Sequence, residues 1–280
     1  MSQANYNLQW HYSPAARRNR VGPNLNQNNT ARYSERMDRV CDYIHQNLSE
    51  KLTLTRLSEV ANFSKYHFHR QFSGYIGMSV ARFIQLMRLK RASYPLAFDK
   101  HIQIIDIAQE AQFENPESFS RAFKNVVGQT PSDFRKSPDW PNWHSKFKFN
   151  LPIRAENTMN IDIVDFPETE IAKLEHLGPP ELILETVSKF RDWRKQSGLS
   201  PVKTSKTFGI PYSDPDVTEP NEFRFDVCGS LETDVPNNPQ GVFMSAIPGG
   251  RCAVTRHAGN LDNIGDTVRA RISNGRISTP

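Results

Sequence analysis

The chain has 280 residues, of which 37% are hydrophobic and 23% charged, and its net charge is +5. This length suits about two domains with their own cores, and no stretch approaches the roughly 20 consecutive apolar residues that span a bilayer. The N-terminus lacks an apolar signal segment, and three scattered cysteines, Cys41, Cys228 and Cys252, exclude a disulfide framework or zinc cluster. We therefore expect a cytoplasmic protein with no membrane segment, metal or cofactor.

Positive charge is confined to the N-terminal half of the chain. Residues 1–33 contain four arginines and no acid, and residues 34–136 contain 15 Lys and Arg against 11 Asp and Glu. Residues 137–280 contain 16 against 19. Because phosphate neutralisation with counterion release dominates affinity for DNA, this polarity favours a polyanionic partner for the first half.

The first segments in chain order are a leader and three helices. Residues 1–33 are polar and lack hydrophobic periodicity, which predicts a mostly disordered leader. Apolar residues at helical spacing predict the first helix: Met37, Val40, Cys41, Ile44 and Leu48. A second helix is predicted to begin at Thr53 or Thr55, and a third at Ser64, which suits an N-cap after a turn at Asn62.

This arrangement recurs about 50 residues later. Before the turn the offset is 50, and the pairs are Leu57 and Ile107, Ala61 and Ala111, and Phe63 and Phe113. After the turn the offset is 51, and the pairs are Phe68 and Phe119, Arg70 and Arg121, Phe72 and Phe123, Gly77 and Gly128, and Phe83 and Phe134. A small residue at a helix crossing, a short turn, and a helix with a Phe-rich inner face are typical of a helix-turn-helix. The sequence predicts an all-α domain over 34–136 with two such units, 53–78 and 104–129.

A linker helix over 79–98 is predicted to join the two units, and it contains Pro95. A proline inside a helix costs roughly 3 kcal/mol or kinks the helix. Two outcomes stay open: the helix stops at Tyr94, or it continues to Phe98 and alters the angle between the units. After the second unit, residues 137–158 are rich in Pro, Asn and Trp, which predicts an interdomain linker.

The patterning changes to strands from residue 160 onward. IDIVDF and TEIAKLEHLG predict two strands, ELILETVSKFRDWRKQSG predicts a helix that ends at Gly198, and KTFGIPYS and FRFDVCGSL predict two more strands. Seven positions recur at an offset of 81: Ile161, Ile163, Phe166, Pro167, Ala172, His176 and Gly178 become Val242, Met244, Ile247, Pro248, Ala253, His257 and Gly259. We expect residues 159–280 to form a duplicated α+β domain of strand-strand-helix-strand-strand units with a pocket between its halves.

The second copy of this repeat is short. The first copy continues for 44 residues after Val187 to Leu231, whereas only 12 residues follow the equivalent Val268. We therefore expect the second copy to be incomplete after about residue 270, which would expose a sheet edge. A variant tail is the alternative interpretation.

Two known families resemble these halves. Residues 104–135, IIDIAQEAQFENPESFSRAFKNVVGQTPSDFR, closely resemble the signature of the AraC/XylS family of transcription regulators. Residues 64–92 resemble the first helix-turn-helix and linker helix of its Rob-like members. GIPYSDP and VTRHAG resemble the GyrI-like effector domain, which binds small, often cationic or amphipathic molecules.

The resemblance implies a transcription regulator that inserts two recognition helices into successive major grooves of double-stranded DNA. It also implies a small-molecule effector bound by the second half, and RNA polymerase as a further partner. Whether the chain is a monomer or a weak dimer stays open, as does the direction of the regulation.

The resemblance also implies site residues, matched by position. Base contacts are expected from Tyr66, His69 and Arg70 in the first recognition helix, and from Glu117, Ser118, Ser120 and Arg121 in the second. Phosphate contacts are expected from Ser64, Lys65, Arg82, Asn115 and Lys124. Arginine suits a bidentate contact with guanine, and glutamate accepts from cytosine. Trp193, Phe208 and Tyr212 are candidates for the effector pocket, with ordinary core packing as the alternative.

Two other functions stay open. One is a GyrI-like hydrolase of small molecules fused to a DNA reader, and the other is an architectural DNA-binding protein without sequence preference. No Ser/His/Asp, Cys/His or metal-ligand set occurs at useful spacing, and His67 and His69 are two residues apart on a helix and do not face each other. The sequence therefore predicts no enzyme.

Overall fold

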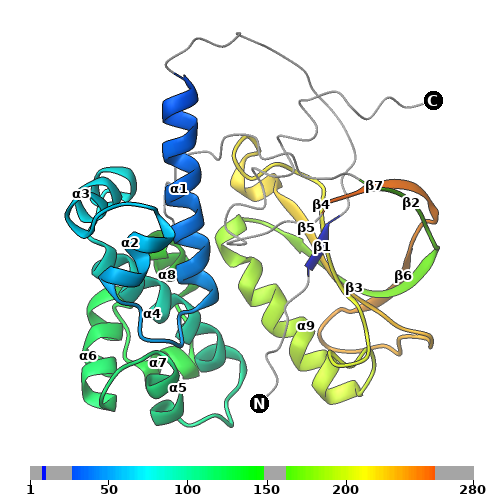
Figure 1. Cartoon of the computed structure of the whole chain (residues 1–280). Helices are drawn as coiled ribbons and strands as arrows, with labels where there is room; N and C mark the ends of the chain where they lie inside the picture. The colour runs from blue at the N-terminus through cyan, green and yellow to red at the C-terminus, as the bar shows by residue number, and fades with distance from the viewer. Residues whose placement is uncertain (1–7, 11–26, 148–161, 256–280) are drawn as a thin grey trace. The chain divides into compact units, whose positions relative to one another are not determined.

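The computed structural model describes residues 8–10, 27–147 and 162–255 (Figure 1). These residues form two compact units, a helical one over 27–147 and a second one that contains the sheets. None of the helices in the described ranges has the length and apolar character that crossing a membrane requires.

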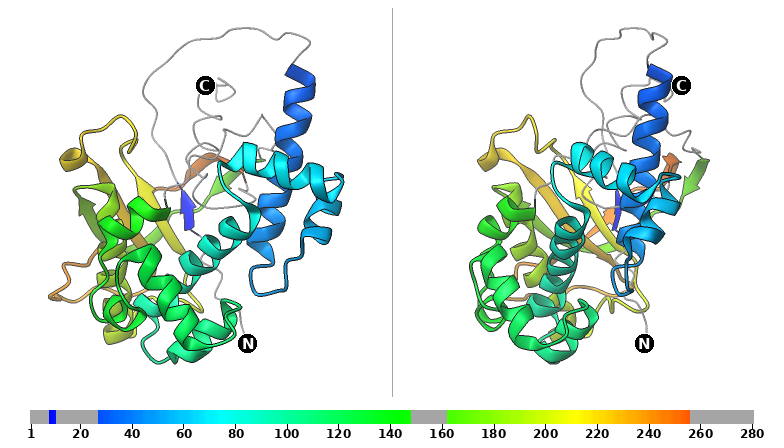
Figure 2. Two further views of the ribbon diagram at one scale, coloured as in Figure 1. Left: turned by 90° about the vertical axis from the view of Figure 1, so that its left-hand side faces the viewer. Right: turned by 60° about the vertical axis from the view of Figure 1, so that its left-hand side comes forward.

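The helical unit contains two short helix pairs joined by one long helix. Its elements are α1 (Gln27–Gln46), α2 (Leu54–Val60), α3 (Lys65–Ile76), α4 (Val80–Phe98), α5 (Ile104–Glu110), α6 (Pro116–Val127), α7 (Pro131–Lys136) and α8 (Trp140–Phe147). The pairs α2–α3 and α5–α6 lie at opposite ends of α4 (Figures 1 and 2). The predicted all-α fold with tandem helix-turn-helix units is confirmed.

The turns of the two units have the same backbone conformation. Asn62 and Gln112, which correspond at the offset of 50, have positive φ angles of 53° and 62°. In each turn the amide of the following phenylalanine donates to the carbonyl five residues earlier, at 2.9 Å and 3.0 Å. The sequence repeat is therefore a repeat of backbone geometry.

The helices α3 and α6 begin and end in the same way. Ser64 and Asn115 each accept a hydrogen bond from the amide three residues later, at 3.4 Å and 2.8 Å. Each helix ends at a glycine in the left-handed region, Gly77 with φ 79° and Gly128 with φ 84°. These caps fix which 12 residues of the chain become the second helix of each unit.

Phenylalanine rings repeat the same packing in both units. Phe72 lies 5.6 Å from both Phe68 and Phe83, measured between ring centroids. In the second unit, Phe123 lies 5.7 Å from its neighbour on α6 and 5.4 Å from Phe134. All these rings are buried, so each stack holds the inner face of its helix and leaves the opposite face outward.

α4 continues through Pro95 to Phe98. Two residues before the proline, the Ser93 hydroxyl donates to the Leu89 carbonyl at 2.9 Å and accepts from the Trp143 indole at 2.8 Å. The apolar residues that follow the proline are buried. Burial of this last turn offsets the backbone hydrogen bond that a proline cannot donate.

The prediction of a linker over 137–158 was wrong for its first part, where residues 140–147 form a helix. α8 lies there, and its three aromatic residues Trp140, Trp143 and Phe147 are 2%, 3% and 2% exposed. They occur at helical spacing, but prolines and asparagines between them hid the pattern. This helix packs its aromatic face against the helical core, with Trp140 5.3 Å from Phe134.

The predicted disordered leader over 1–33 also contains regular structure. α1 begins at Gln27, and strand β1 (Leu8–Trp10) pairs in parallel with β4 of the second unit. Residues 8–10 and 27–36 lie before the apolar period that begins at Met37, so the pattern did not predict regular structure there. Backbone pairing along a strand needs no such period, because the main chain supplies the hydrogen bonds.

The second unit is α+β, as predicted. Its main elements are β2 (Asp162–Phe166), β3 (Thr169–Leu177), α9 (Ile183–Ser197), β4 (Thr207–Pro211), β5 (Arg224–Ser230), β6 (Phe243–Ile247) and β7 (Gly250–Val254), with short 3-10 turns at Pro180–Leu182 and Pro220–Glu222. One sheet has the order β1-β4-β5-β3-β6, and β2 and β7 form a separate ribbon. α9 ends at Gly198, which has φ 69°.

The offset of 81 appears in the pairing of these strands. β2 pairs with β7, and β3 pairs with β6, both antiparallel. Phe166 faces Gly250 in the first pair, and their equivalents face each other in the second pair as Ile247 and Thr169. The two registers are therefore related by an internal two-fold exchange, which confirms the duplicated pattern for these strands. The residues after 255, where the second copy was expected to be incomplete, lie outside the described range.

Two apolar clusters lie on opposite faces of the larger sheet. Phe190 and Trp193 of α9 pack against one face together with Val227 of β5. Phe208 of β4 packs on the other face with Cys228, the next residue along β5. Because successive side chains of a strand point to opposite faces, α9 covers only one side of the sheet.

Two glycines near the end of α3 are expected to respond oppositely to the same substitution. Gly74 lies inside the helix with no atom within 4 Å of an added Cβ, so Gly74→Ala should stabilise by about 0.5–1 kcal/mol. Gly77 has φ 79°, so Gly77→Ala should destabilise by about 1–2 kcal/mol. Thermal unfolding of the full chain measures both changes, and a shift of the same sign for both variants would contradict this account.

Candidate nucleic-acid interface and effector site

The outer face of α3 presents the predicted base-contacting residues of the first unit. Tyr66, His69 and Arg70 are exposed, and Tyr66 is 82% exposed although it is a large aromatic residue. The Tyr66 ring therefore adds exposed aromatic surface to the outer face of α3. Ser64, which caps the helix, and Lys65 are also exposed at its N-terminal end.

The outer face of α6 presents the equivalent residues of the second unit. Glu117 and Arg121 are exposed, whereas Ser118 and Ser120 are half-buried. The Ser118 hydroxyl donates to the carbonyl of Asn115 at 2.9 Å, so this side chain already takes part in the first turn of the helix. Lys124 lies exposed one turn after Arg121.

α1 holds α3 through contacts that the sequence reasoning missed. The Tyr33 hydroxyl donates to the Gln71 carbonyl at 2.8 Å, and the Tyr75 hydroxyl donates to the Asp38 carboxylate at 3.1 Å. Burial, with the nearby Asp38 charge, raises the pKa of Tyr75 and keeps its hydroxyl a donor. Tyrosines spaced along α1 and α3 were the available signal.

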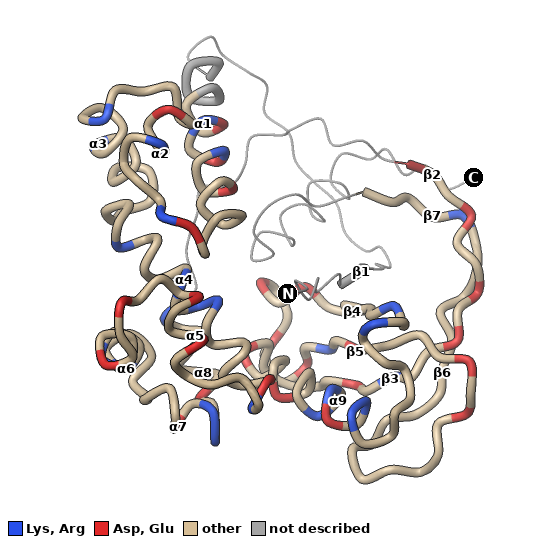
Figure 3. Tube along the Cα trace, turned by 60° about the horizontal axis from the view of Figure 1, so that its bottom comes forward, with Lys and Arg blue, Asp and Glu red and all other residues tan. Residues whose placement is uncertain are grey.

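An open groove of about 510 Å³ lies within the helical unit, between its two helix-turn-helix pairs. Leu52, the first half of α4 and the second turn line it, including Arg82, Gln85, Arg88 and Gln112. The Arg82 guanidinium is exposed and donates to the Gln85 amide oxygen at 2.8 Å. Figure 3 shows Lys and Arg on α3 and along α4, so positive charge continues from the first unit toward the groove.

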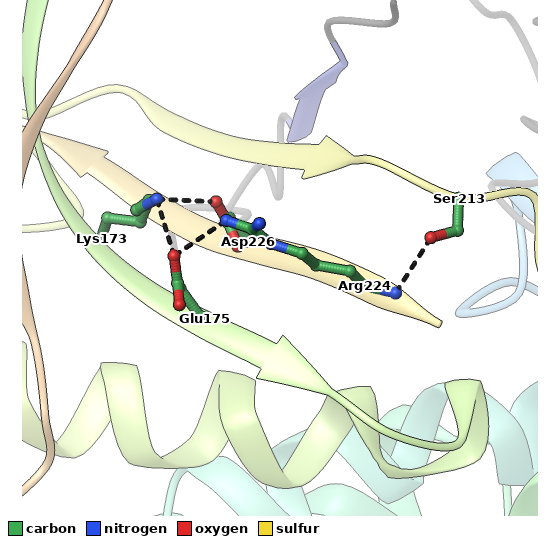
Figure 4. Close-up of polar contacts among 5 residues, drawn as sticks. All are labelled: Lys173, Glu175, Ser213, Arg224 and Asp226. Atoms are coloured by element: carbon green, nitrogen blue, oxygen red, sulfur yellow. Dashed lines mark hydrogen bonds and ion pairs between the residues drawn. The ribbon is translucent and has the colours of Figure 1, made fainter. Parts of the chain in front are cut away.

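The second unit carries a quartet of charged side chains that the sequence reasoning did not single out: Lys173 and Glu175 on β3, and Arg224 and Asp226 on β5 (Figure 4). The Lys173 ammonium lies 3.0 Å from the Glu175 carboxylate and 3.2 Å from the Asp226 carboxylate. Arg224 donates to Glu175 at 2.9 Å. These residues alternate along their strands with core residues, so the quartet lies on the sheet face opposite α9.

Aromatic rings flank this quartet. The Arg224 guanidinium lies 4.3 Å from the centroid of the Tyr212 ring, and the Lys173 ammonium lies 5.0 Å from that of Phe243. Tyr212 is 50% exposed and Phe243 is 43% exposed. The face therefore combines exposed aromatic surface with paired charges, a combination suited to a small amphipathic molecule.

Lys173, Glu175 and the neighbouring Tyr212 have shifted pKa values. Partial burial acts to lower the pKa of Lys173, but its bonds to Glu175 and Asp226 outweigh that effect and raise it. The hydrogen bond from Lys173 lowers the pKa of Glu175, against a small opposing effect of burial. Burial raises the pKa of Tyr212, with the Asp226 carboxylate acting in the same direction. Nearby, burial raises the pKa of the Cys228 thiol to about 12.

The structure does not bring the three predicted effector residues together. Trp193 and Phe208 are 2% and 0% exposed and belong to the two clusters on opposite faces of the sheet. Tyr212 alone lies beside the charged quartet. The alternative that large aromatics serve the core fits Trp193 and Phe208.

The described residues contain no group of three or more His, Cys, Asp and Glu placed to hold a metal ion. His67 contacts Phe63 instead, with ring centroids 4.9 Å apart.

Two capped helices with exposed polar faces, set in repeated helix-turn-helix units, define a DNA-binding helix-turn-helix protein. Residues 57–137 match a family described as a helix-turn-helix domain, and residues 159–274 match the GyrI-like small molecule binding domain. The chain belongs to the AraC-type regulators that carry a GyrI-like domain.

The chain is similar to several individual proteins. The chain is 49% identical over 111 residues to the probable transcriptional regulator YgiV of Escherichia coli K12, which is 40% of this chain and 69% of that protein. It is 28% identical over 193 residues to the right origin-binding protein of E. coli K12, covering 64% of this chain and 63% of that protein. A crystal structure of an AraC-type transcriptional regulator from Chromobacterium violaceum matches with a TM-score of 0.36 and 21% identity, over 38% of this chain and 95% of that one.

The ion pair at the centre of the quartet gives a testable coupling. Asp226 is 0% exposed, so Lys173→Met leaves a buried carboxylate without its nearest cation and should cost about 3 kcal/mol of unfolding free energy. Adding Asp226→Leu should recover most of this loss, because the isolated buried charge disappears. Urea unfolding of the full chain measures both, and additive losses in the double variant would show that the pair is not coupled.

Proposed function

We propose that the chain regulates transcription by binding a specific DNA site with both helix-turn-helix units, α3 entering one major groove and α6 the next. Residues 34–136, with α8 packed onto them, form the DNA-reading domain in this proposal, and residues 159–280 form the effector domain. The observation that carries it is the repeat itself: the same turn, cap, phenylalanine stack and exposed outer face occur twice, at opposite ends of α4.

The side chains divide into two roles. Tyr66, His69 and Arg70, together with Glu117, Ser118, Ser120 and Arg121, are proposed to contact base edges. They lie in the first half of each helix, and all except the half-buried Ser118 and Ser120 are exposed. Ser118 has the weakest case, since its hydroxyl is already bonded to Asn115. Ser64, Lys65, Arg82, Asn115 and Lys124 are proposed to contact phosphates, because they are exposed at the capped starts, on α4 and one turn further along α6.

The chain contains two helix-turn-helix units, α2–α3 and α5–α6, which we call the two heads. We therefore propose that it binds DNA as a monomer in the cytoplasm. We also propose that it acts on RNA polymerase without any catalysis of its own. In this arrangement the DNA backbone phosphates between the two occupied major grooves would face Arg82, which lines the open groove of the protein. An architectural protein without sequence preference is the competing function, and it would need no outward base-contacting set in both units.

We propose further that the sheet face with Tyr212, Phe243 and the charged quartet binds a small-molecule effector. Glu175 supports a ligand with donor groups, because its carboxylate is exposed on this face, whereas Asp226 is buried beside Lys173. The flanking rings suit the apolar part of such a molecule. Trp193 and Phe208 would act only by supporting the sheet on its two sides.

Arginine and lysine substitutions should separate base from phosphate contacts. Arg70→Ala and Arg121→Ala should each weaken binding to the selected DNA site by about 1–3 kcal/mol. Each should relax the base preference only in the half of the site that its own helix reads. Lys124→Ala should weaken binding to all sequences alike and reduce the salt slope by about one. The measurement is selection from a randomised DNA pool with the full chain, followed by anisotropy titrations at two salt concentrations.

Lys189→Ala, at an exposed position on α9, is the matched control and should change nothing. Two enriched blocks roughly 10 base pairs apart are expected. Failure to enrich any site, with binding lost at moderate salt, would favour the architectural function instead.

Effector binding is tested by thermal shift with aromatic ammonium compounds against neutral and anionic compounds of equal size. A cationic compound at 100 times its Kd should stabilise the full chain by about 2.7 kcal/mol. Tyr212→Ala and Phe243→Ala should reduce that shift, whereas Val217→Ala, which removes an apolar side chain that is 82% exposed, should not. Equal shifts in all three variants would place the ligand elsewhere.

A further inference from the structure

The loop between α1 and α2 accepts three side-chain hydrogen bonds on consecutive carbonyls. Arg88 of α4 donates to Leu48 at 2.9 Å and to Glu50 at 2.7 Å. Between them, the Gln112 amide donates to the Ser49 carbonyl at 2.7 Å. The loop leads directly into the first helix-turn-helix, whereas Gln112 lies in the turn of the second.

Gln112 therefore links the second helix-turn-helix unit to the loop that enters the first one. It spans 63 residues of sequence, and both it and Arg88 line the groove between the heads. On the same side, Arg91 of α4 donates to Glu110 at the end of α5 at 2.6 Å. These polar contacts tie both heads to α4, across a space that apolar packing leaves open.

The residue type at position 112 is unusual for its backbone. Gln112 has φ 62°, a conformation that glycine or asparagine adopts more readily, and its counterpart in the first turn is Asn62 with φ 53°. Asparagine is one methylene shorter than glutamine. The length of the glutamine side chain lets its amide reach Ser49. Within the part of the chain that the structure describes, the Asn62 side chain makes no equivalent hydrogen bond.

We propose that Gln112 is a positioning residue that sets the base-pair spacing between the two half-sites, by fastening the second turn to the loop that enters the first unit. This inference rests on the proposed DNA-reading function. The two recognition helices are joined through one long helix, so a small change of angle at the groove changes which spacing both heads read together. Gln112 itself is not proposed to contact DNA.

The test uses the full chain and DNA in which the two selected blocks are separated by the preferred spacing or by one or two base pairs more or fewer. Gln112→Gly keeps the turn and removes the donor, and Gln112→Met keeps the length and removes the donor. Both should bind the preferred spacing within about threefold of the parent chain, yet reduce discrimination against the neighbouring spacings by roughly threefold to tenfold. Asn62→Gly is the matched control and should leave the spacing profile unchanged.

Unchanged profiles in both Gln112 variants would overturn the proposal, as would equal broadening by Asn62→Gly, which would assign the effect to turn flexibility. If the parent chain selects no DNA site with two blocks, the proposed DNA-reading function fails instead. A measurement without DNA still tests the bridge from Gln112 to Ser49. Spin labels on His69→Cys and Lys124→Cys report the distance between the heads, with Cys41 and Cys252 replaced by serine and Cys228 protected by burial. The distance distribution should broaden in Gln112→Met, and an unchanged distribution would refute the bridge.

Discussion

Burial of the repeated phenylalanine stacks is the interaction on which the helical unit depends. Phe72 packs between Phe68 and Phe83, and Phe123 occupies the equivalent place in the second unit. Once these rings take the inner face of α3 and α6, a helix of 3.6 residues per turn leaves the residues between them facing outward. The exposure of Tyr66 and Arg121 is therefore a consequence of where the phenylalanines lie, and a recognition surface follows from a core pattern.

How much the sequence predicted depended on which physical signal each feature leaves in it. Apolar periods and the offsets of 50, 51 and 81 predicted both helix-turn-helix units, α4 and the strands β2 to β7, because burial repeats along the chain. α8 was missed, since Trp140 and Trp143 stand among prolines and asparagines that read as a linker. The base-contacting positions came from the family resemblance, and their exposure agrees with those positions without testing the contacts.

The charged quartet shows why polar sites escape a reading by period. Lys173, Glu175 and Asp226 alternate with core residues along two strands. Each strand sequence alone therefore looks like an ordinary strand with one apolar and one polar face. Only the antiparallel register of β3 and β5, in which Glu175 faces Asp226, turns separate charges into one cluster. Long-range register is not encoded in any local window, and the predicted effector residues were chosen by aromatic character instead.

The two kinds of interaction have separable consequences in the helical unit. Apolar packing determines the internal geometry of each head, and it is cooperative, so weakening it unfolds the head rather than turning it. The relation between the heads depends on α4 and on exposed polar contacts such as Gln112 with Ser49, which are individually weak. Under the proposed function, this arrangement makes the spacing adjustable, because single polar substitutions are expected to change the angle between the helix-turn-helix units while both cores stay intact. Selection on spacing can therefore act on the groove residues without passing through an unfolded or unstable chain.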